Sequence, residues 1–147
     1  MSRVVLDTCG WLAYFADEAH ADKFAPYVEE EGCVLVPAIV EYEVRRWAVR
    51  EVGEEKANMY AAAMSRHEAV PIDAGLARRA ADLGHGHKLA ACDALVYAVA
   101  ELRGVALVTA DPDLEGLPNV EFHEKPGAGG KSKKARRGAA RIGSESG

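Results

Sequence analysis

The sequence has few cysteines and no long apolar run. Its three cysteines, Cys9, Cys33 and Cys92, are scattered over 147 residues, which excludes a disulfide framework and a CxxC metal site. No stretch approaches the about 18 consecutive apolar residues that a membrane-spanning helix needs, and the first residues show no basic and apolar leader. We therefore expect a reduced, cytoplasmic protein with no membrane segment.

Positive charge is scarce in most of the chain. The net charge is -5, but residues 127–147 alone carry +5, which leaves about -10 for the 126 residues before them. Such an acidic body binds nucleic acid poorly unless bound cations reverse the local charge. Because 126–147 is rich in Gly, Ser, Lys and Arg and has little to bury, we predict one domain at 1–125 and a flexible basic tail at 126–147.

The acidic body has enough apolar residues for one core and alternates between two patterns. Hydrophobic residues make up 49% of the chain. Short apolar runs predict strands at 4–6, 34–37, 69–72, 105–108 and 120–122, and helical spacing predicts helices at 8–15, 19–31, 38–51, 54–65, 74–83 and 89–102, with a loop at 85–87. This alternation predicts an α/β fold in which helices cover both faces of a parallel sheet.

Four carboxylates fall where they can converge. Asp7 directly follows the first predicted strand and Asp111 comes just after the fourth, so both lie at the carboxyl edge of the sheet, where α/β proteins bind ligands. Glu43 and Asp93 each share the inward, apolar face of their helix. We therefore predict that all four side chains meet at one place.

A metal ion is the simplest explanation for such a group. A buried carboxylate must be neutralised, paired or bound to a metal, and no inward-facing bases match these acids. Oxygen-only ligands suit Mg²⁺ or Mn²⁺ rather than zinc, and such an ion polarises phosphoryl oxygens and generates a nucleophile. We predict Asp7, Glu43, Asp93 and Asp111 to be metal ligands for phosphodiester hydrolysis, with Asp93 orienting or deprotonating the attacking water.

Each acid also has a purely structural explanation. Asp7 can cap the helix after it, Glu43 can be a half-exposed helix acid, and Asp93 can be an N-cap. Asp111 stands before a proline, a pattern typical of turns. Asp113 can be a fifth ligand or the cap of a short helical turn, and we favour the cap.

Four motifs contain the four acids: VLDT at 5–8, VPAIVEYEV at 36–44, LAACDALVYA at 89–98 and LVTAD at 107–111. With these motifs the chain resembles PIN-domain proteins, and within that family the VapC-type toxin ribonucleases of type II toxin-antitoxin systems. The motifs occur in the family's order, and the similarity covers about residues 3–123. The third and fourth motifs are the most specific.

The resemblance implies a three-layer α/β/α sandwich with about five parallel strands and an endoribonuclease that depends on Mg²⁺ or Mn²⁺. It also implies an RNA substrate, a homodimer and a small cognate antitoxin protein. Aligning the aliphatic residues of the second motif selects Glu43 and leaves Glu41 as the spare acid. The family usually has asparagine where Cys9 stands, so one polar contact near the metal is replaced.

Other residues have weaker signals. Thr8 and Thr109 can steady carboxylates by hydrogen bonds or can cap strand ends, and Arg46 can meet an RNA phosphate or remain a solvated helix residue. We interpret Trp47 as a packing residue. His85 and His87 lack a third ligand, which disfavours a metal pair. If Cys9 impairs the site, the alternative function is a catalytically weak module that binds RNA or a protein.

Overall fold

The secondary structure alternates strands with helices or helix pairs over residues 2–127, the part of the chain that the computed structural model describes. The strands are β1 (Val4–Leu6), β2 (Val34–Pro37), β3 (Glu68–Val70), β4 (Ala106–Thr109) and β5 (Val120–Phe122). The α-helices are α1 (Thr8–Phe15), α2 (Ala25–Glu29), α3 (Ala38–Glu51), α4 (Glu54–Met64), α5 (Ala74–His87) and α6 (Ala91–Arg103), and the 3-10 turns are η1 (Ala21–Lys23) and η2 (Pro112–Leu114). Nearly all of the predicted tail 126–147 lies outside the described residues, so the domain boundary at 125 stays a prediction.

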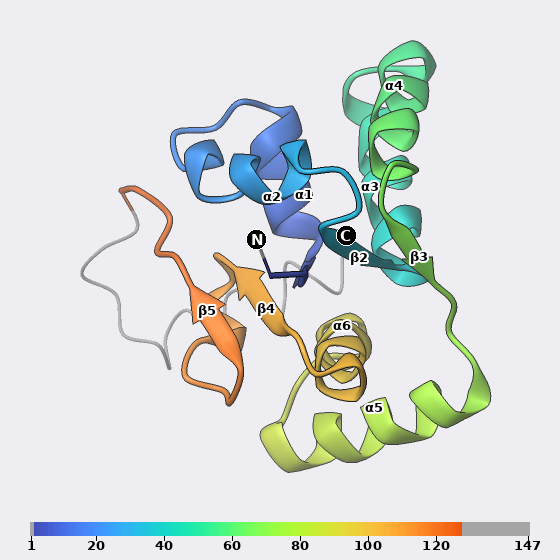
Figure 1. Ribbon diagram of the computed structural model, residues 1–147, viewed down its shortest axis with the longest axis vertical. Coiled ribbons are helices and arrows are strands. Elements are labelled where there is room, and N and C mark those ends of the chain that lie inside the picture. Colours follow the sequence, from blue (N-terminus) through green and yellow to red (C-terminus); the bar gives the residue numbers. More distant parts are fainter. Residues whose placement is uncertain (1, 128–147) are drawn as a thin grey trace.

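The five strands form one parallel sheet in the order β3-β2-β1-β4-β5 (Figure 1). The central strand β1 is fully buried, with Val5 opposite Leu35 of β2 and Leu107 of β4. The inner strands are continuous apolar runs because helices cover both of their faces. The strand order reverses between β1 and β4, and ligands of open α/β sheets bind beyond the strand ends at such a point.

The helices form a layer on each side of the sheet. In Figure 1, α1 and α2 lie above the strands, α5 and α6 lie below them, and α3 and α4 stand beside β2 and β3. The helices α3 and α4 form a hairpin in which Arg45 donates a hydrogen bond of 2.6 Å to Asn58. The predicted three-layer α/β/α sandwich with a five-stranded parallel sheet is confirmed.

Helix α6 covers the middle of the sheet, where it contacts β1, β2 and β4. Its inward residues are almost completely buried from Val96 to Ala100. Helix α5 packs closely on it, because a Cβ atom at Gly84 would come within 3.2 Å of the Ala94 Cβ. Helix α6 ends at Gly104, whose φ of 65° is in the left-handed region that favours glycine.

Four segments differ from the sequence prediction by two residues or more at an end, and the other bounds agree to within one residue. Residues 85–87 are not a loop: they complete α5, since the chain leaves the helix only at Lys88, whose φ is 58°. Helix α6 therefore begins at Ala91 and not at residue 89. The predicted helix 19–31 is divided into η1 and α2, because Pro26 lacks the N–H of a continuous helix and occupies the first turn of α2. The third strand is residues 68–70 rather than 69–72.

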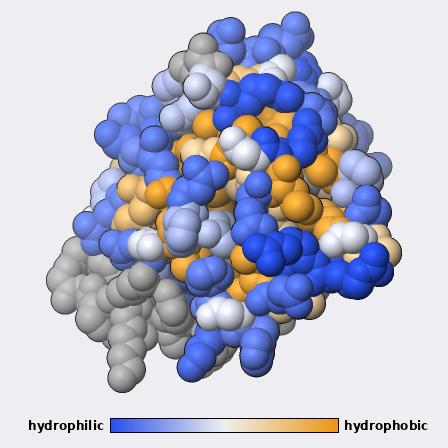
Figure 2. Space-filling view, turned by 60° about the horizontal axis from the view of Figure 1, so that its bottom comes forward, coloured by the Kyte–Doolittle hydropathy of each residue, from blue (hydrophilic) through white to orange (hydrophobic). Residues whose placement is uncertain are grey.

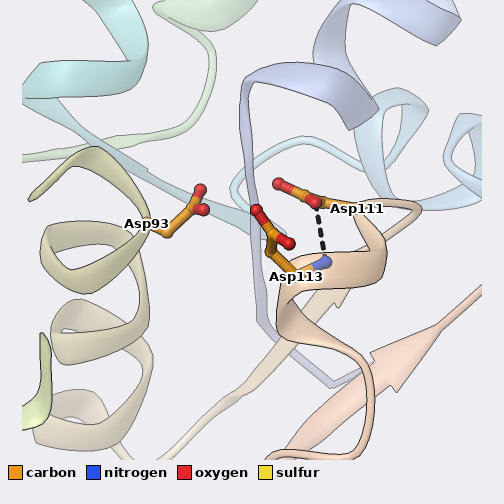
Figure 3. A group of neighbouring side chains, drawn as sticks. All are labelled: Asp93, Asp111 and Asp113. Carbon is orange, nitrogen blue, oxygen red and sulfur yellow. Dashed lines mark hydrogen bonds between the residues drawn. The ribbon is translucent and has the colours of Figure 1, made fainter. Parts of the chain in front are cut away.

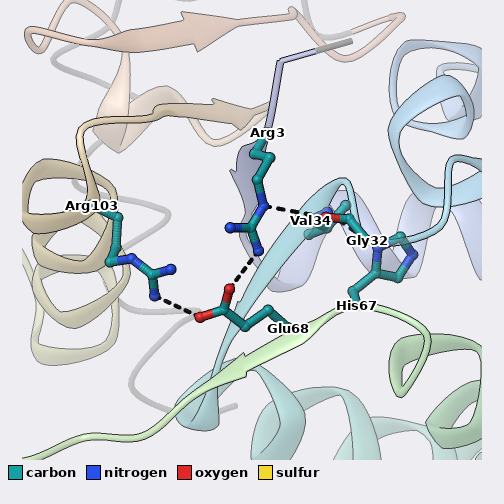
Figure 4. Close-up of polar contacts among 6 residues, drawn as sticks. All are labelled: Arg3, Gly32, Val34, His67, Glu68 and Arg103. Atoms are coloured by element: carbon teal, nitrogen blue, oxygen red, sulfur yellow. Dashed lines mark hydrogen bonds and ion pairs between the residues drawn. The ribbon is translucent and has the colours of Figure 1, made fainter.

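A charged network lies at the edge of the sheet where the strands begin, here called the amino edge (Figure 4). Glu68 accepts from Arg3 at 2.6 Å through one oxygen and pairs with Arg103 at 2.8 Å through the other. These hydrogen bonds and charges hold the pKa of Glu68 at about 2, below its usual 4.5. The carboxylate thereby links the starts of β1 and β3 to the end of α6.

His67 joins two further segments at the amino edge. The Val34 N–H donates to Nδ1 of His67 at 3.1 Å, so the ring proton is on Nε2, which donates to the Val28 carbonyl at 2.9 Å. The residue is only 8% exposed, and burial lowers the pKa of the imidazole. His67 is therefore a neutral structural residue that ties α2 and β2 to the start of β3.

The face that carries α5 has an apolar surface. In Figure 2, which brings this side forward, hydrophobic residues gather in the middle and hydrophilic residues surround them. A cavity of about 520 Å³ between α5 and α6 is lined mainly by alanines and leucines, with His85 as its one ionisable residue. Within residues 2–127, none of the helices has the length and apolar character needed to span a bilayer.

Candidate active site

Asp7 anchors the site at the end of the central strand. Its backbone is extended, and its Oδ1 accepts a hydrogen bond of 3.0 Å from the Gly10 N–H, so it is the N-cap of α1. The side chain is 5% exposed. A Cβ atom on Gly10 would lie 3.0 Å from the Phe24 ring, so glycine lets α1 begin tightly beside the carboxylate. The structural interpretation of Asp7 as a helix cap is thus confirmed, and its second oxygen is left for another partner.

A chain of hydrogen bonds connects Asp7 with the segment after β4. Thr109 donates to Oδ2 of Asp7 at 2.5 Å and accepts from the Asp111 N–H at 2.9 Å. The Asp113 N–H in turn donates to Oδ1 of Asp111 at 2.9 Å. Thr109 therefore orients the two acids that come from the neighbouring strands β1 and β4.

Glu43 enters the site from the second turn of α3. Thr8 donates a hydrogen bond of 2.6 Å to its Oε1, which joins the first turn of α1 to α3. Glu43 lines the same cavity as Asp7, whereas Glu41 is not among the lining residues. The choice of Glu43 over Glu41 in the second motif therefore agrees with the geometry. Both threonines donate to carboxylates, as the first of their two sequence interpretations expected.

Asp93, Asp111 and Asp113 bring their carboxylates together (Figure 3). One oxygen from each lies within 4.8 Å of the others. Asp93 belongs to the first turn of α6, Asp111 follows β4, and Asp113 lies in η2. Asp93 is not an N-cap, since that position is Ala90.

Asp113 corrects the sequence prediction. We favoured it as a cap, but Asp111 is the N-cap of η2. Asp113 is the second residue of η2, is 5% exposed and has its carboxylate beside that of Asp93. The cause is Pro112, which occupies the first position of η2 and makes the preceding aspartate the cap. The site thus holds five acids rather than four.

Burial and mutual repulsion favour the neutral forms of the acids. Burial raises the pKa of Asp7 from 3.8 to about 7, although the hydrogen bond from Thr109 opposes this rise. Burial also raises the pKa of Asp93 to about 8, and the charges of Asp111 and Asp7 add to the effect. Each of these acids is costly to ionise unless positive charge arrives.

The acids open into a cavity of about 450 Å³. Its wall has three kinds of residue: the acids Asp7, Glu43, Asp93 and Asp111; the polar or thiol residues Thr8, Cys9 and Cys92; and a largely apolar part with Leu12, Trp47, Val96, Ala110 and Pro112. Arg50 and Lys125 add two positive charges. The sequence interpretation missed these two basic residues, and it assigned Trp47 to packing although the indole is half-buried at the cavity.

The remaining candidates lie away from this wall. Arg46 donates to the hydroxyl of Tyr42 at 3.4 Å and is exposed, so the solvated interpretation fits it. His87 packs edge-on against Tyr97 with ring centroids 5.7 Å apart, and His85 lines the other cavity. Neither histidine belongs to the group of Asp93, Asp111 and Asp113.

The donor set determines which ligand suits the site. Five carboxylates supply only hard oxygen ligands, which prefer Mg²⁺, Mn²⁺ or Ca²⁺ to softer metals. Cys92 interacts with Glu43, and burial raises the pKa of its thiol to about 12, so at neutral pH the thiol is protonated and is a poor ligand. The arrangement can therefore bind a divalent cation and, through it, an anionic group.

Comparisons with solved structures show where this architecture recurs. The chain is similar to a toxin-antitoxin complex from Klebsiella pneumoniae (24% identity, 82% of this chain and 98% of that chain, TM-score 0.70). It is also similar to a DNA-bound VapBC from Salmonella typhimurium (17% identity, 84% of this chain and 98% of that chain, TM-score 0.68). A third similar structure is VapC20 of Mycobacterium tuberculosis, described as a sarcin-ricin loop cleaving toxin (20% identity, 72% of this chain and 86% of that chain, TM-score 0.60). At these identities the likeness shows the fold. No curated protein sequence matches the chain.

The sequence itself matches one family model, described as the PIN domain, over residues 4–120. That span includes every acid of the site, from Asp7 directly after β1 to Asp113 in η2. It also contains all five strands except the last two residues of β5. The protein therefore belongs to the PIN domain family.

Proposed function

We propose that this protein is an endoribonuclease that hydrolyses RNA phosphodiester bonds with the help of Mg²⁺ or Mn²⁺, and that it acts in the cytoplasm as the toxin of a toxin-antitoxin pair. One observation carries the proposal: acids from α3 and α6 and from the segments after β1 and β4 converge on one cavity at the point where the strand order reverses. Membership of the PIN domain family supports the same activity.

The residues fit a divalent cation. The oxygens of Asp93, Asp111 and Asp113 lie close enough together to share an ion, and Asp7 and Glu43 line the same cavity. In the proposal Asp7, Glu43, Asp93 and Asp111 hold the ion, and Asp113 is a fifth candidate ligand. A bound cation would supply charge neutralisation and would polarise the phosphoryl oxygen of the substrate.

The protein's own groups perform the positioning. Thr109 and Thr8 fix the carboxylates of Asp7 and Glu43 through their hydroxyls. Asp93, in the first turn of α6, orients the water whose oxygen forms the new bond to phosphorus while the bond to the leaving ribose oxygen breaks. Arg50 and Lys125 attract the RNA backbone at the wall of the cavity.

The partners belong to the same proposal. The similar structures from Klebsiella and Salmonella are described as toxin-antitoxin or VapBC complexes, which supports a small antitoxin as a partner of this chain. We also propose a homodimer. The test is to co-express the neighbouring short reading frame: we expect it to co-purify with the protein and to relieve growth arrest, and sedimentation should give twice the monomer mass for the free protein.

Cleavage of structured RNA by the purified protein tests the catalytic proposal. We expect cleavage with Mg²⁺ or Mn²⁺, none with EDTA, and none by the variants Asp7→Ala and Asp93→Asn. Glu41→Gln is the matched control, because Glu41 lies in the same motif but not in the cavity lining. Cleavage that survives both substitutions in the site would come from a contaminant and would remove the enzyme assignment.

The alternative of a binding module rests on Cys9. Its thiol lines the cavity where the family usually has asparagine. A catalytically weak protein would bind RNA in Mg²⁺ without cutting it, and Cys9→Asn would then produce cleavage. If the unmodified protein already cleaves RNA and Cys9→Asn changes the rate little, this alternative is excluded.

A further inference from the structure

The cavity is larger and more apolar than a cation and a phosphate require. Cation ligands lie about 2.0–2.6 Å from an ion, so the acid group needs only one part of a space of about 450 Å³. Cavities of roughly 300–1,000 Å³ with a mostly apolar wall and a few polar groups are typical of small-molecule sites. The part of the wall away from the acids therefore has room for a further piece of the substrate.

Three helices build this wall in the same way. Each contributes a polar residue beside the acid group and an apolar residue one turn further along: Thr8 and Leu12 from α1, Glu43 and Trp47 from α3, Asp93 and Val96 from α6. Residues three or four apart lie on the same face of a helix, one turn or about 5.4 Å along its axis. An acid layer and an apolar layer are thus adjacent and share one cavity.

The two tryptophans show that the apolar layer is not simply core. Trp11 is fully buried and packs against Phe15 and His67 with ring centroids 5.7 and 5.6 Å apart. Trp47 is half-buried at the cavity, and within residues 2–127 its ring has no aromatic neighbour. The Trp47 side chain thus lines the cavity without a ring stacked on it among the described residues.

We propose that Leu12, Trp47 and Val96 form a nucleobase subsite, in which the base next to the scissile phosphate of a single-stranded RNA segment stacks on the Trp47 indole. This inference rests on the proposed ribonuclease function, because the phosphate at the acids places the adjacent base at the neighbouring apolar layer. Proteins commonly read unpaired RNA by stacking bases on aromatic side chains. Arg50, one turn beyond Trp47 on α3, is placed to meet the next phosphate.

A fluorescence experiment tests the subsite without cleavage. Nucleoside monophosphates and ribose 5-phosphate are titrated in Mg²⁺ into the unmodified protein and into Trp47→Phe, and the difference reports on Trp47 alone. We expect the nucleotides to quench Trp47 emission and ribose 5-phosphate to leave it unchanged. Equal quenching in Trp47→Phe, or no quenching by any nucleotide, overturns the subsite.

A cleavage experiment then tests whether the substrate uses the nucleobase subsite. Base stacking on an aromatic residue contributes about 1–3 kcal/mol, so Trp47→Ala should raise KM roughly 5- to 150-fold. Trp47→Phe should restore most of the affinity, and Val49→Ala, on the exposed side of α3, should leave KM unchanged. An abasic residue beside the cut should impair the unmodified protein and have no further effect on Trp47→Ala. Thermal unfolding of each variant separates misfolding from lost binding.

The outcomes distinguish the two proposals. RNA that is cut equally well by Trp47→Ala, with or without the abasic residue, would overturn the subsite and leave the ribonuclease in place. Nucleotide quenching of Trp47 without any cleavage would keep the subsite and remove the nuclease. If Trp47→Ala weakened only the complex with the antitoxin, the wall would belong to that protein partner and the base subsite would be wrong.

Discussion

The two edges of the sheet shift the pKa values of their carboxylates in opposite directions. At the amino edge, Glu68 lies between two arginines, and its pKa is held at about 2. At the carboxyl edge, Asp7 and Asp93 are buried among other acids, and their pKa values rise to about 7 and about 8. The amino edge therefore stabilises the ionised form of its acid. At the carboxyl edge the ionised acids repel one another, and a bound cation would reduce this repulsion.

This difference separates stability from function within one fold. Paired groups that link segments, such as Glu68 and His67, are arranged to hold the strands at one edge. At the other edge, hydrogen bonds hold the acids in place without neutralising them. Natural proteins accept such local repulsion mainly where it supports binding or catalysis. Substitutions at the two edges should therefore have different signatures.

The largest difference is expected in catalysis. Asp111→Asn should lower kcat/KM with Mg²⁺ by more than the ~10- to 100-fold loss that follows removal of a residue behind the metal ligands. Glu68→Gln should leave kcat/KM unchanged, because Glu68 is at the far edge. Steady-state cleavage of one RNA substrate by both variants is the measurement. Comparable losses in the two variants would mean that the edges are coupled and would break the comparison.

The second prediction concerns His67. His67→Ala leaves the Val34 N–H and the Val28 carbonyl without this partner and opens a void, so we expect the free energy of unfolding to fall by roughly 2–4 kcal/mol. Mg²⁺ affinity should not change. Urea unfolding and calorimetric titration with Mg²⁺ test the two parts. Weaker Mg²⁺ binding in a folded variant would contradict the separation of the edges.

The third prediction concerns the stability of the metal-free protein, which should depend on pH in the opposite direction at the two edges. The raised pKa values of Asp7 and Asp93 mean that the folded state binds more protons than the unfolded state, so metal-free protein should lose stability as pH rises from about 4 to about 8. Asp93→Asn should raise metal-free stability at pH 8 by ~1–3 kcal/mol. Thermal unfolding with and without Mg²⁺ tests this.

The control for this prediction is the cation itself. Mg²⁺ should raise the Tm of the unmodified protein at pH 8, because it binds the folded state alone, and should raise that of Asp93→Asn less. If the Tm of the metal-free protein does not fall between pH 4 and pH 8, ionisation of the acids at the carboxyl edge does not destabilise the fold.

The smallest effect is expected for Glu68→Gln. Because the folded pKa of Glu68 is depressed, its contribution is present above pH 4.5 and is lost as pH falls towards about 2. The three side chains of the network are each more than one-third exposed, so solvent screening limits the loss to less than ~1 kcal/mol at neutral pH. Added salt should reduce it further. A loss that persists in 1 M NaCl would assign Glu68 a role beyond charge pairing.

Much of the site could be predicted because local rules place its residues. Asp7 and Asp111 follow strands, and Glu43 and Asp93 lie on inward helix faces, so strand direction and helical spacing are enough to bring them together. Asp113 could not be placed in this way. Its direction depends on how η2 starts at Pro112, and the cap could be assigned to either aspartate from sequence.

Trp47 shows another limit of sequence patterns. It lies on the same helix face as Glu43, and this spacing correctly predicts that it points inward. An apolar inward residue is the same in sequence whether a neighbour covers it or a cavity opens beside it. That choice depends on how α1 and α6 approach α3, which only the tertiary structure shows. The same holds for residues 85–87, where Gly84 and Gly86 suggested a loop and the packing of α5 on α6 keeps the segment helical.

The reversal of strand order has a consequence for biosynthesis. Strand β4 pairs with β1, although β2 and β3 come between them in the chain, so Asp7 meets its hydrogen-bond partner Thr109 only after 102 further residues have been translated. A ribosome that stalls before Asp111 releases a fragment without a complete set of acids. Under the proposed function, the active site therefore stays incomplete until about three-quarters of the 147 residues have been translated.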